Sequence, residues 1–312
     1  MRPLTDLELL DELEPTVAAN LDRHLAMVQE WMPHEWVPWS RGRDFAGDNG
    51  LAWSPDQSQL SEAARAAFVV NLLTEDNLPS YHHELMVRYG RDSAWKAWVH
   101  RWTAEEARHA MSIRDYLVLS RAVDPAALER DRMATTEAGW SAEGRDMLRS
   151  LVYVALQELA TRVAHQNTGR VANDPVADRL LTRIALDENL HMVFYRDLVA
   201  AALALAPDQT MLAIASEVMG FKMPGAGVPG FLRRSVQIAE AGIYDVRLHR
   251  DEVLSPLMRQ WQALTLRVTT NAAKQAQSTL AWHLDRLEQM AKRYEERRVR
   301  GSSFSSQRQP RD

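Results

Sequence analysis

Apolar residues recur at intervals of three and four along most of this chain, which is the spacing of one face of an α-helix. The same spacing predicts a long last helix from about Ser255 to Arg298. No run of alternating apolar and polar residues indicates a β-sheet. We therefore predict an all-α protein. The first helical stretch, residues 4–31, contains Pro15 and has its apolar positions at Leu7, Leu10, Leu13, Val17, Leu21 and Leu25.

Four long helices are predicted in two pairs between these ends of the chain. Each pair is divided by residues that end helices, Gly90 in the first and Asn173-Asp174-Pro175 in the second. Pro79 lacks the N–H that would bond the carbonyl of Glu75, so we expect a kink beside Glu75. The long helices are expected at 61–88, 92–123, 141–170 and 175–206, short helices at 124–139, 207–220 and 231–241, and surface loops at 32–58 and 221–230.

A pattern that suits metal binding occurs twice on the predicted helices. Glu106 and His109 are three residues apart, and so are Glu188 and His191. Residues three apart lie on the same face of an α-helix, where a carboxylate and an imidazole can bind one ion together. A single E-x-x-H sequence is more often solvated surface, but here the pattern is doubled.

Each E-x-x-H pair also has a glutamate upstream at nearly the same distance. Glu75 precedes Glu106 by 31 positions (106 − 75), and Glu158 precedes Glu188 by 30 (188 − 158). With a turn at each midpoint, both hairpins bring their glutamate level with their E-x-x-H pair, roughly 22 Å from the turn at about 1.5 Å per residue. Two such hairpins form a ferritin-like four-helix bundle with additional helices, and six inward ligands suit two iron or manganese ions.

Composition narrows the possible functions of these 312 residues. The formal charge of −5 argues against a general nucleic-acid binder. The absence of cysteine excludes disulfides and thiolate ligands, so a metal must use oxygen and nitrogen ligands, which suits iron or manganese. No run of about 18 apolar residues could span a membrane, and the N-terminus has no signal-peptide pattern. We expect a cytoplasmic protein with one domain over residues 1–298 and a disordered tail, rich in Ser, Arg and Gln, over 299–312.

Several other polar residues are assigned provisional roles. Glu105 and Asp187 each precede a candidate ligand and could orient an imidazole from outside, with a solvated flank as the alternative. Thr161 lies one turn after Glu158, so its hydroxyl faces either the metal site or a backbone carbonyl. The remaining histidines considered, His82, His83 and His165, are expected to be structural.

Four sequence words in this chain resemble the soluble acyl-carrier-protein desaturases of plant plastids and actinobacteria. They are T-E-D-N-L-P-S-Y (74–81), E-E-A-R-H (105–109), Q-E-L-A-T-R (157–162) with N-T-G-R (167–170), and D-E-N-L-H (187–191). The resemblance covers about residues 4–230, and more weakly extends to 252. The plant form has Arg where this chain has Leu190, a plastid transit peptide, and a different loop over 38–58. The actinobacterial branch is the closer match.

The resemblance implies that Glu75, Glu106, His109, Glu158, Glu188 and His191 are ligands of two iron ions, for which manganese could substitute. It also implies that Thr161 is the active-site threonine. Asp187, His109 and Trp39 match the electron path proposed for the family. Such an enzyme introduces a cis double bond into a saturated acyl chain, using O2 and two external electrons.

The implied partners are an acyl carrier protein bearing the fatty acyl chain, a ferredoxin-type electron donor, and a second copy of the chain in a homodimer. Lys222, Arg233 and Arg234 are candidates for a basic patch that receives the acidic carrier, with solvated surface charge as the alternative. Two other functions remain open from the residues. One is a di-iron oxygenase or N-oxygenase with another substrate, and the other is a ferritin-like iron store or binding protein.

Overall fold

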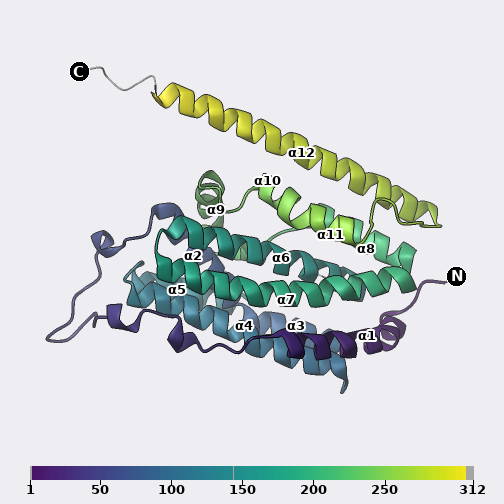
Figure 1. The fold of residues 1–312 in the computed structure, drawn as a ribbon, viewed down its shortest axis with the longest axis horizontal. Helices are drawn as coiled ribbons and strands as arrows, with labels where there is room; N and C mark the ends of the chain where they lie inside the picture. The colour runs from purple at the N-terminus through teal and green to yellow at the C-terminus, as the bar shows by residue number, and fades with distance from the viewer. Residues whose placement is uncertain (1, 143, 307–312) are drawn as a thin grey trace.

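The computed structural model describes residues 2–142 and 144–306, and the side chains of these residues as far as 297, apart from those of 224 and 226. Every regular element in these ranges is helical, which confirms the all-α prediction. The long helices lie roughly along one direction, with the last helix across the outside of the bundle (Figure 1). The elements of five residues or more are α1 (Asp6–Met27), α2 (Glu62–Glu75), α3 (Leu78–Tyr89), α4 (Ala94–Leu119), α5 (Pro125–Ala138), α6 (Met147–Ala172), α7 (Pro175–Leu205), α8 (Pro207–Gly220), α9 (Phe231–Glu240), a π-helical segment (His249–Leu254), α11 (Ser255–Gln260) and α12 (Asn271–Ser306).

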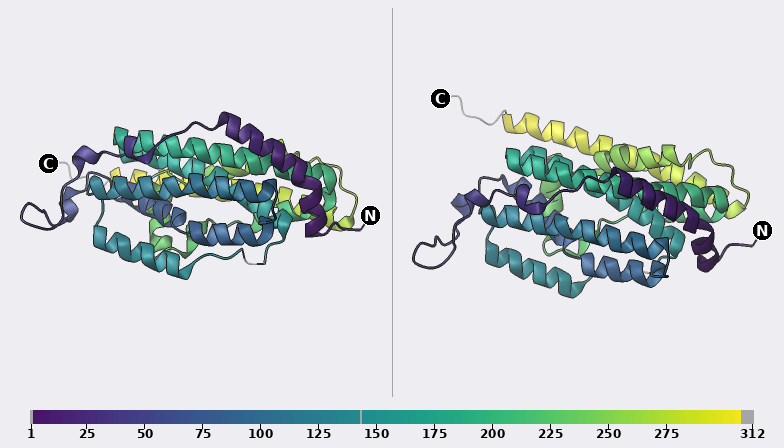
Figure 2. Two further views of the ribbon diagram at one scale, coloured as in Figure 1. Left: turned by 90° about the horizontal axis from the view of Figure 1, so that it is seen from below. Right: turned by 60° about the horizontal axis from the view of Figure 1, so that its bottom comes forward.

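The two predicted hairpins form the centre of the molecule. α2 and α3 lead into α4 through Gly90, and α6 turns into α7 at Asn173, whose φ of 52° ends α6 in a left-handed conformation. Both turns lie where the midpoint argument placed them. α1 packs across α4 and α7, and the views in Figure 2 show it on the outer side of these two helices. The expected helix over residues 4–31 is shorter at both ends, and Pro15 is accommodated inside it.

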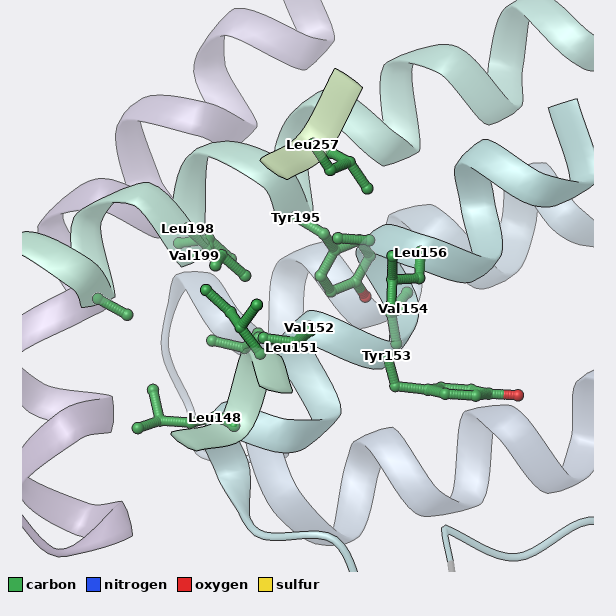
Figure 3. Close-up of a cluster of buried hydrophobic side chains, with 14 of the residues drawn as sticks. Leu148, Leu151, Val152, Tyr153, Val154, Leu156, Tyr195, Leu198, Val199 and Leu257 are labelled. Atoms are coloured by element: carbon green, nitrogen blue, oxygen red, sulfur yellow. The ribbon is translucent and has the colours of Figure 1, made fainter. Parts of the chain in front are cut away.

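The most extensive helix pair is α6 with α7, and apolar side chains pack between the parts of these helices that flank the polar cluster. Figure 3 shows Leu151 and Val152 of α6 beside Leu198 and Val199 of α7, with Leu257 of α11 close to the same layer. Their burial, at roughly 25 cal/mol per Å² of apolar surface removed from water, is the main stabilisation of this pair. The core therefore holds α6 and α7 in fixed register around the polar residues that they carry.

The first predicted leg, 61–88, is two helices rather than one kinked helix. α2 ends at Glu75, and α3 begins at Leu78, with Pro79 in its first turn. The kink expected from Pro79 is thus a complete break beside Glu75. The Arg132 guanidinium of α5 binds both carboxylate oxygens of Asp76, at 2.6 and 3.0 Å, and holds the break in place.

The predicted last helix, 255–298, is also interrupted. α11 ends at Gln260, Gln262 takes a positive φ of 50°, and α12 begins only at Asn271. Asp208 of α8 accepts bonds from the backbone N–H groups of Thr269 and Thr270, which fixes the connection. The apolar residues with helical spacing over 261–268 thus lie in a non-helical connection whose side chains pack on the core. α12 is helical to Ser306, past residue 298, and the rest of the expected tail, 307–312, lies outside the described residues.

The loop over 32–58 wraps the end of the bundle, as predicted, with short 3₁₀ turns at Pro33–Glu35, Trp39–Arg41 and Pro55–Gln57. Arg121 holds it by donating to the Gln57 side chain at 2.6 Å and to the carbonyls of Arg43 and Leu51. No helix among the described residues is long and apolar enough to cross a membrane.

Candidate metal centre

Six side chains from the four central helices converge inside the bundle. Glu75 ends α2, Glu158 is in the middle of α6, and the two E-x-x-H pairs are on α4 and α7. All of them are buried, none more than 6% exposed. The helix register that follows from the two turns therefore brings together the six residues that the sequence singled out: Glu75, Glu106, His109, Glu158, Glu188 and His191.

The six residues form two overlapping groups. In each group, one nitrogen or oxygen from every member lies within 4.8 Å of the others. Glu106 and Glu188 belong to both groups, so each could bridge two ions. The first group adds Glu75 and His109, and the second adds Glu158 and His191.

Both imidazoles turn the same nitrogen inward. Nδ1 of His109 lies 3.1 Å from Glu106 Oε2 and 3.4 Å from Glu188 Oε1. Nδ1 of His191 lies 2.7 Å from Glu106 Oε1 and 3.7 Å from Glu158 Oε2. The outer nitrogens, both Nε2, face a second carboxylate in each half. This arrangement, with one nitrogen free for a metal and the other bonded to a carboxylate, is common among histidine ligands.

Three buried polar atoms in the cluster have no hydrogen-bond partner: Glu106 Oε1, Glu158 Oε2 and His191 Nδ1. Glu106 Oε1 and His191 Nδ1 are close but not aligned for a hydrogen bond. Buried polar atoms without partners are costly, and a cation between them would remove that cost. A set of four carboxylates and two imidazoles without sulfur suits iron or manganese, so these residues fit a pair of such ions.

The electrostatics of the cluster also favour a cation. Burial raises the pKa of Glu75 well above its usual range, and the charges of Glu106 and Glu188 raise it further. Burial likewise raises the pKa of Glu158, with the Glu188 charge adding to the effect. Burial also disfavours the charge of Glu106, but the adjacent imidazoles of His109 and His191 outweigh it and lower its pKa. Four carboxylates this close can all be ionised only if positive charge is placed among them.

Outside the ligand positions, Asp187 and Glu105 each face an imidazole, as predicted. Asp187 Oδ2 lies 3.4 Å from Nε2 of His109, and Glu105 Oε2 lies 2.8 Å from Nε2 of His191. Burial disfavours the Glu105 charge, but hydrogen bonds from His191 and His24 outweigh it and lower its pKa. Both carboxylates can therefore accept from the outer N–H of their imidazole.

The resemblance assigns Asp187, His109 and Trp39 to an electron path, and no hydrogen bond or ring contact among the described residues links Trp39 to the other two. Trp39 is 53% exposed, and its indole N–H donates to the carbonyl of His34 at 2.8 Å. Trp31 contacts both residues: its indole donates to Asp187 Oδ2 at 2.7 Å and lies nearly parallel to the His109 ring. The sequence could not decide between them, because both lie in or next to an irregular loop whose path helical spacing does not predict.

Thr161 fits both interpretations that the sequence left open. Its hydroxyl lies 2.9 Å from Glu188 Oε2, and 3.0 and 3.1 Å from the carbonyls of Glu158 and Gln157. One hydroxyl hydrogen can serve only one of these acceptors at a time. The side chain can therefore donate to a ligand carboxylate and return to the backbone.

His165, which the sequence analysis treated as structural, lies against the cluster. Its Nε2 is 3.1 Å from Glu75 Oε1, and its Nδ1 faces the amide nitrogen of Asn71 at 3.2 Å. Because the amide nitrogen of Asn71 can only donate, Nδ1 accepts and Nε2 carries the proton that Glu75 accepts. Burial lowers the pKa of His165 to about 4, so the ring is neutral at pH 7. Its position seven residues after Glu158, two turns along the same face, was the available signal.

A cavity of about 80 Å³ adjoins the cluster between α2, α6 and the segment 223–244. Glu75, Thr161 and His165 form its polar end. Most of the remaining wall is apolar, including Val70, Met223, Phe231, Ile238 and Ile243. The centre therefore has a predominantly apolar approach, suited to a hydrocarbon.

The helical bundle and its paired carboxylate–histidine groups define a ferritin-like fold built around a candidate two-metal centre. The chain belongs to the fatty acid desaturase family, whose model matches residues 5–309. It is accordingly an oxidoreductase enzyme. The match covers the hairpins and the last helix.

Individual relatives agree with this family. The chain is 46% identical over 300 residues to DesA1 of Mycobacterium tuberculosis, named as an acyl-carrier-protein desaturase, with 94% of this chain and 89% of that protein covered. It is 27% identical over 322 residues to the chloroplastic stearoyl-acyl-carrier-protein 9-desaturase of Spinacia oleracea, covering 97% and 80% of the two chains. The X-ray structure of DesA2 from M. tuberculosis matches with a TM-score of 0.71 at 31% identity, covering 86% of this chain and 98% of that one. These comparisons support the actinobacterial branch.

Proposed function

We propose that this protein is an acyl-carrier-protein desaturase that introduces a cis double bond into a saturated fatty acyl chain. The observation that carries the proposal is the pair of buried ligand groups that share Glu106 and Glu188 beside an apolar cavity. Glu75 and His109 would complete one iron site, and Glu158 and His191 the other. Two iron ions held there would supply the O2 activation needed to remove hydrogens from two adjacent methylenes. Manganese is the possible substitute.

The protein's own side chains orient the substrate and exclude water. An acyl chain in the cavity would lie along Val70, Phe231 and Ile238 and present its methylenes to the end formed by Glu75 and Thr161. Burial of the alkyl chain contributes about 0.8 kcal/mol per CH2 group. The Thr161 hydroxyl, 2.9 Å from Glu188 Oε2, can hold a proton at the substrate side of the centre.

The two electrons would come from outside this chain, because the sequence contains no cysteine to ligate an iron–sulfur cluster and no flavin-binding fingerprint. A ferredoxin-type donor is our proposal. In this proposal electrons would reach the metal centre along Trp31, Asp187 and His109, which contact one another in that order. Asp187 remains a proposed member of the path, and Trp31 takes the place first given to Trp39.

The acyl chain would arrive on an acyl carrier protein, as the names of DesA1 and the spinach enzyme suggest. Of the three basic residues considered for docking, Lys222 is exposed next to the cavity residue Met223. Arg234 pairs with Asp131 at 2.9 Å in a partly buried contact, whereas Arg233 and its partner Glu62, 3.2 Å away, are both exposed. Its position next to the cavity makes Lys222 the stronger candidate. Homodimerisation stays a prediction.

The test is a reconstituted reaction. The protein is loaded with ferrous iron, reduced through ferredoxin, and given stearoyl- or palmitoyl-carrier protein under O2, with mass analysis of the acyl products. We expect a single monoene and no product when O2 or ferredoxin is omitted. Hydroxylated or N-oxidised products would favour the oxygenase alternative. Iron uptake with no organic product from any chain length would favour an iron store.

A further inference from the structure

We propose that His24 of α1 is a positioning residue for the half of the centre that contains His191. It fixes the Glu105 carboxylate, and through Glu105 it fixes the orientation of the His191 ring. The inference rests on the proposed function, since it concerns how a metal ligand is held. His24 belongs to none of the four helices that supply ligands, and no sequence pattern singled it out.

The hydrogen bonds at Glu105 determine which nitrogens carry protons. Nε2 of His24 lies 2.9 Å from Glu105 Oε2, and Nε2 of His191 lies 2.8 Å from the same oxygen. An ionised carboxylate can only accept, so both Nε2 atoms donate. The donation from His191 leaves its Nδ1 lone pair directed at Glu106 and Glu158, where a metal would bind.

Packing leaves His24 little freedom to do anything else. The residue is 3% exposed, its ring meets Trp98 edge-on at 5.0 Å between centroids, and it stacks on His191 at 5.8 Å. Arg101 binds the other Glu105 oxygen, Oε1, at 2.5 Å. Glu105 is therefore held from three helices. Without His24, the carboxylate loses one of the two donors at Oε2 and can turn toward Arg101, whose side chain is partly exposed.

A third metal site at His24, Glu105 and His191 is the alternative, since donor atoms of these residues lie within 4.8 Å of one another. Arg101 already compensates the Glu105 charge, and both facing nitrogens are needed as donors to Glu105. A cation there would be repelled by Arg101 and would displace both hydrogen bonds. The geometry thus favours a hydrogen-bonded support for His191.

The experiment compares two substitutions of the same polar type. In His24→Gln, the amide nitrogen can reach the position of Nε2 and donate to Glu105, whereas the shorter His24→Asn cannot. Both variants and the wild type are loaded with 57Fe(II) and studied by Mössbauer spectroscopy, iron counting and chelator competition. Trp31→Phe is the matched control, because it removes one of the donors to Asp187 in the other half and leaves Arg108 and Arg183 in place.

We expect His24→Asn to alter one of the two iron signals and weaken iron binding at that site about tenfold, the lower end of the effect of losing an outer-shell partner. His24→Gln should restore the wild-type signal, and Trp31→Phe should alter the other signal. If metal-free His24→Asn does not melt cooperatively, His24→Phe, which keeps a ring but no donor, takes its place.

Two results would overturn the inference alone: wild-type spectra and affinity in His24→Asn, or equal changes in both iron signals, which indicate general loosening. A wild-type protein that binds fewer than two irons would overturn the proposed function, and this inference with it. Three irons in the wild type and two in His24→Asn would establish the third-site alternative instead.

Discussion

The two halves of the metal centre have the same ligands but different surroundings. In the His109 half, Asp187 backs the imidazole at 3.4 Å and is itself bound by Trp31, Arg108 and Arg183. In the His191 half, Glu105 makes a shorter contact of 2.8 Å and is bound by His24 and Arg101. The doubled sequence repeats the carboxylate before each ligand and an arginine four residues before that carboxylate. The halves differ because one further support, His24 or Trp31, comes from outside the repeat.

The upstream glutamates differ in the same way. Glu158 lies within the continuous helix α6 and accepts from the Trp102 indole at 3.1 Å, whereas Glu75 is the last residue of α2 and faces His165. The His109 half also adjoins the cavity through Glu75. The half with the broken helix is therefore the one on the substrate side in the proposed function.

The largest effect is expected from removing a ligand. Glu158→Gln should lower turnover by at least about 100-fold, since loss of an outer-shell partner alone costs 10–100-fold. The metal-free variant should remain folded. Burial already disfavours the charged form of Glu158 and raises its pKa, and the neutral glutamine avoids the cost of burying that charge. Iron stoichiometry, turnover and thermal melting measure the three quantities, with Glu75→Gln as the matching change in the other half. Full turnover in either variant would refute the ligand assignment.

Metal affinity should depend strongly on pH. Because the pKa values of Glu75 and Glu158 are raised in the folded protein, protons compete with metal there. Affinity should fall as pH is lowered, by up to about tenfold per pH unit for each proton displaced.

The same shifts fix the sign of the pH effect on the stability of the metal-free protein. A carboxyl group with a raised folded-state pKa contributes stability below its unfolded-state pKa, and this contribution is lost as pH rises through the folded-state value. The melting temperature without metal should therefore decline as pH rises above the ordinary carboxyl range, and added metal should reverse the decline. A melting temperature indifferent to metal at neutral pH would contradict this prediction.

A smaller effect, on the order of tenfold, is expected for Trp31→Phe when ferredoxin supplies the electrons, because the variant removes the indole donor to Asp187. Trp39→Phe should change turnover little, since Trp39 contacts the carbonyl of His34 rather than the path. Steady-state turnover with ferredoxin and with a small chemical reductant separates electron delivery from the later chemistry. Equal rates for the two variants would remove Trp31 from the path.

The smallest effect concerns the break between α2 and α3. Arg132→Met should lower the free energy of unfolding by about 1–3 kcal/mol, because it leaves the mostly buried Asp76 carboxylate without its charged partner. Denaturant unfolding of the metal-free protein measures the loss, and the double variant with Asp76→Asn should recover part of it. If iron affinity also falls, the break contributes to the placement of Glu75.

The sequence predicted the bundle and its ligands because both follow from helical periodicity and turn residues. The six candidate ligands could be found by spacing alone, since the fixed rise of a helix places them at the same height in the bundle. His24 and Trp31 could not, because their contacts depend on how α1 and the wrapped loop pack against the bundle. His165 had a spacing signal, seven residues after Glu158, but its contact with Glu75 depends on how α2 packs against α6. The break at Gln262 was missed for a related reason: Leu264 and Val268 continue a helical spacing although the backbone there turns to meet Asp208.

The end of α2 at Glu75 has a mechanical consequence. A carboxylate in the middle of a helix can adjust only by rotating its side chain. At a helix terminus the backbone can also tilt without breaking the hydrogen bonds that hold the helix together. Glu75 is therefore the ligand whose backbone is less constrained by its own helix, and Glu158 is the more constrained one. Filling of the cavity beside Glu75 and rearrangement around the nearer metal would then be a single coupled movement.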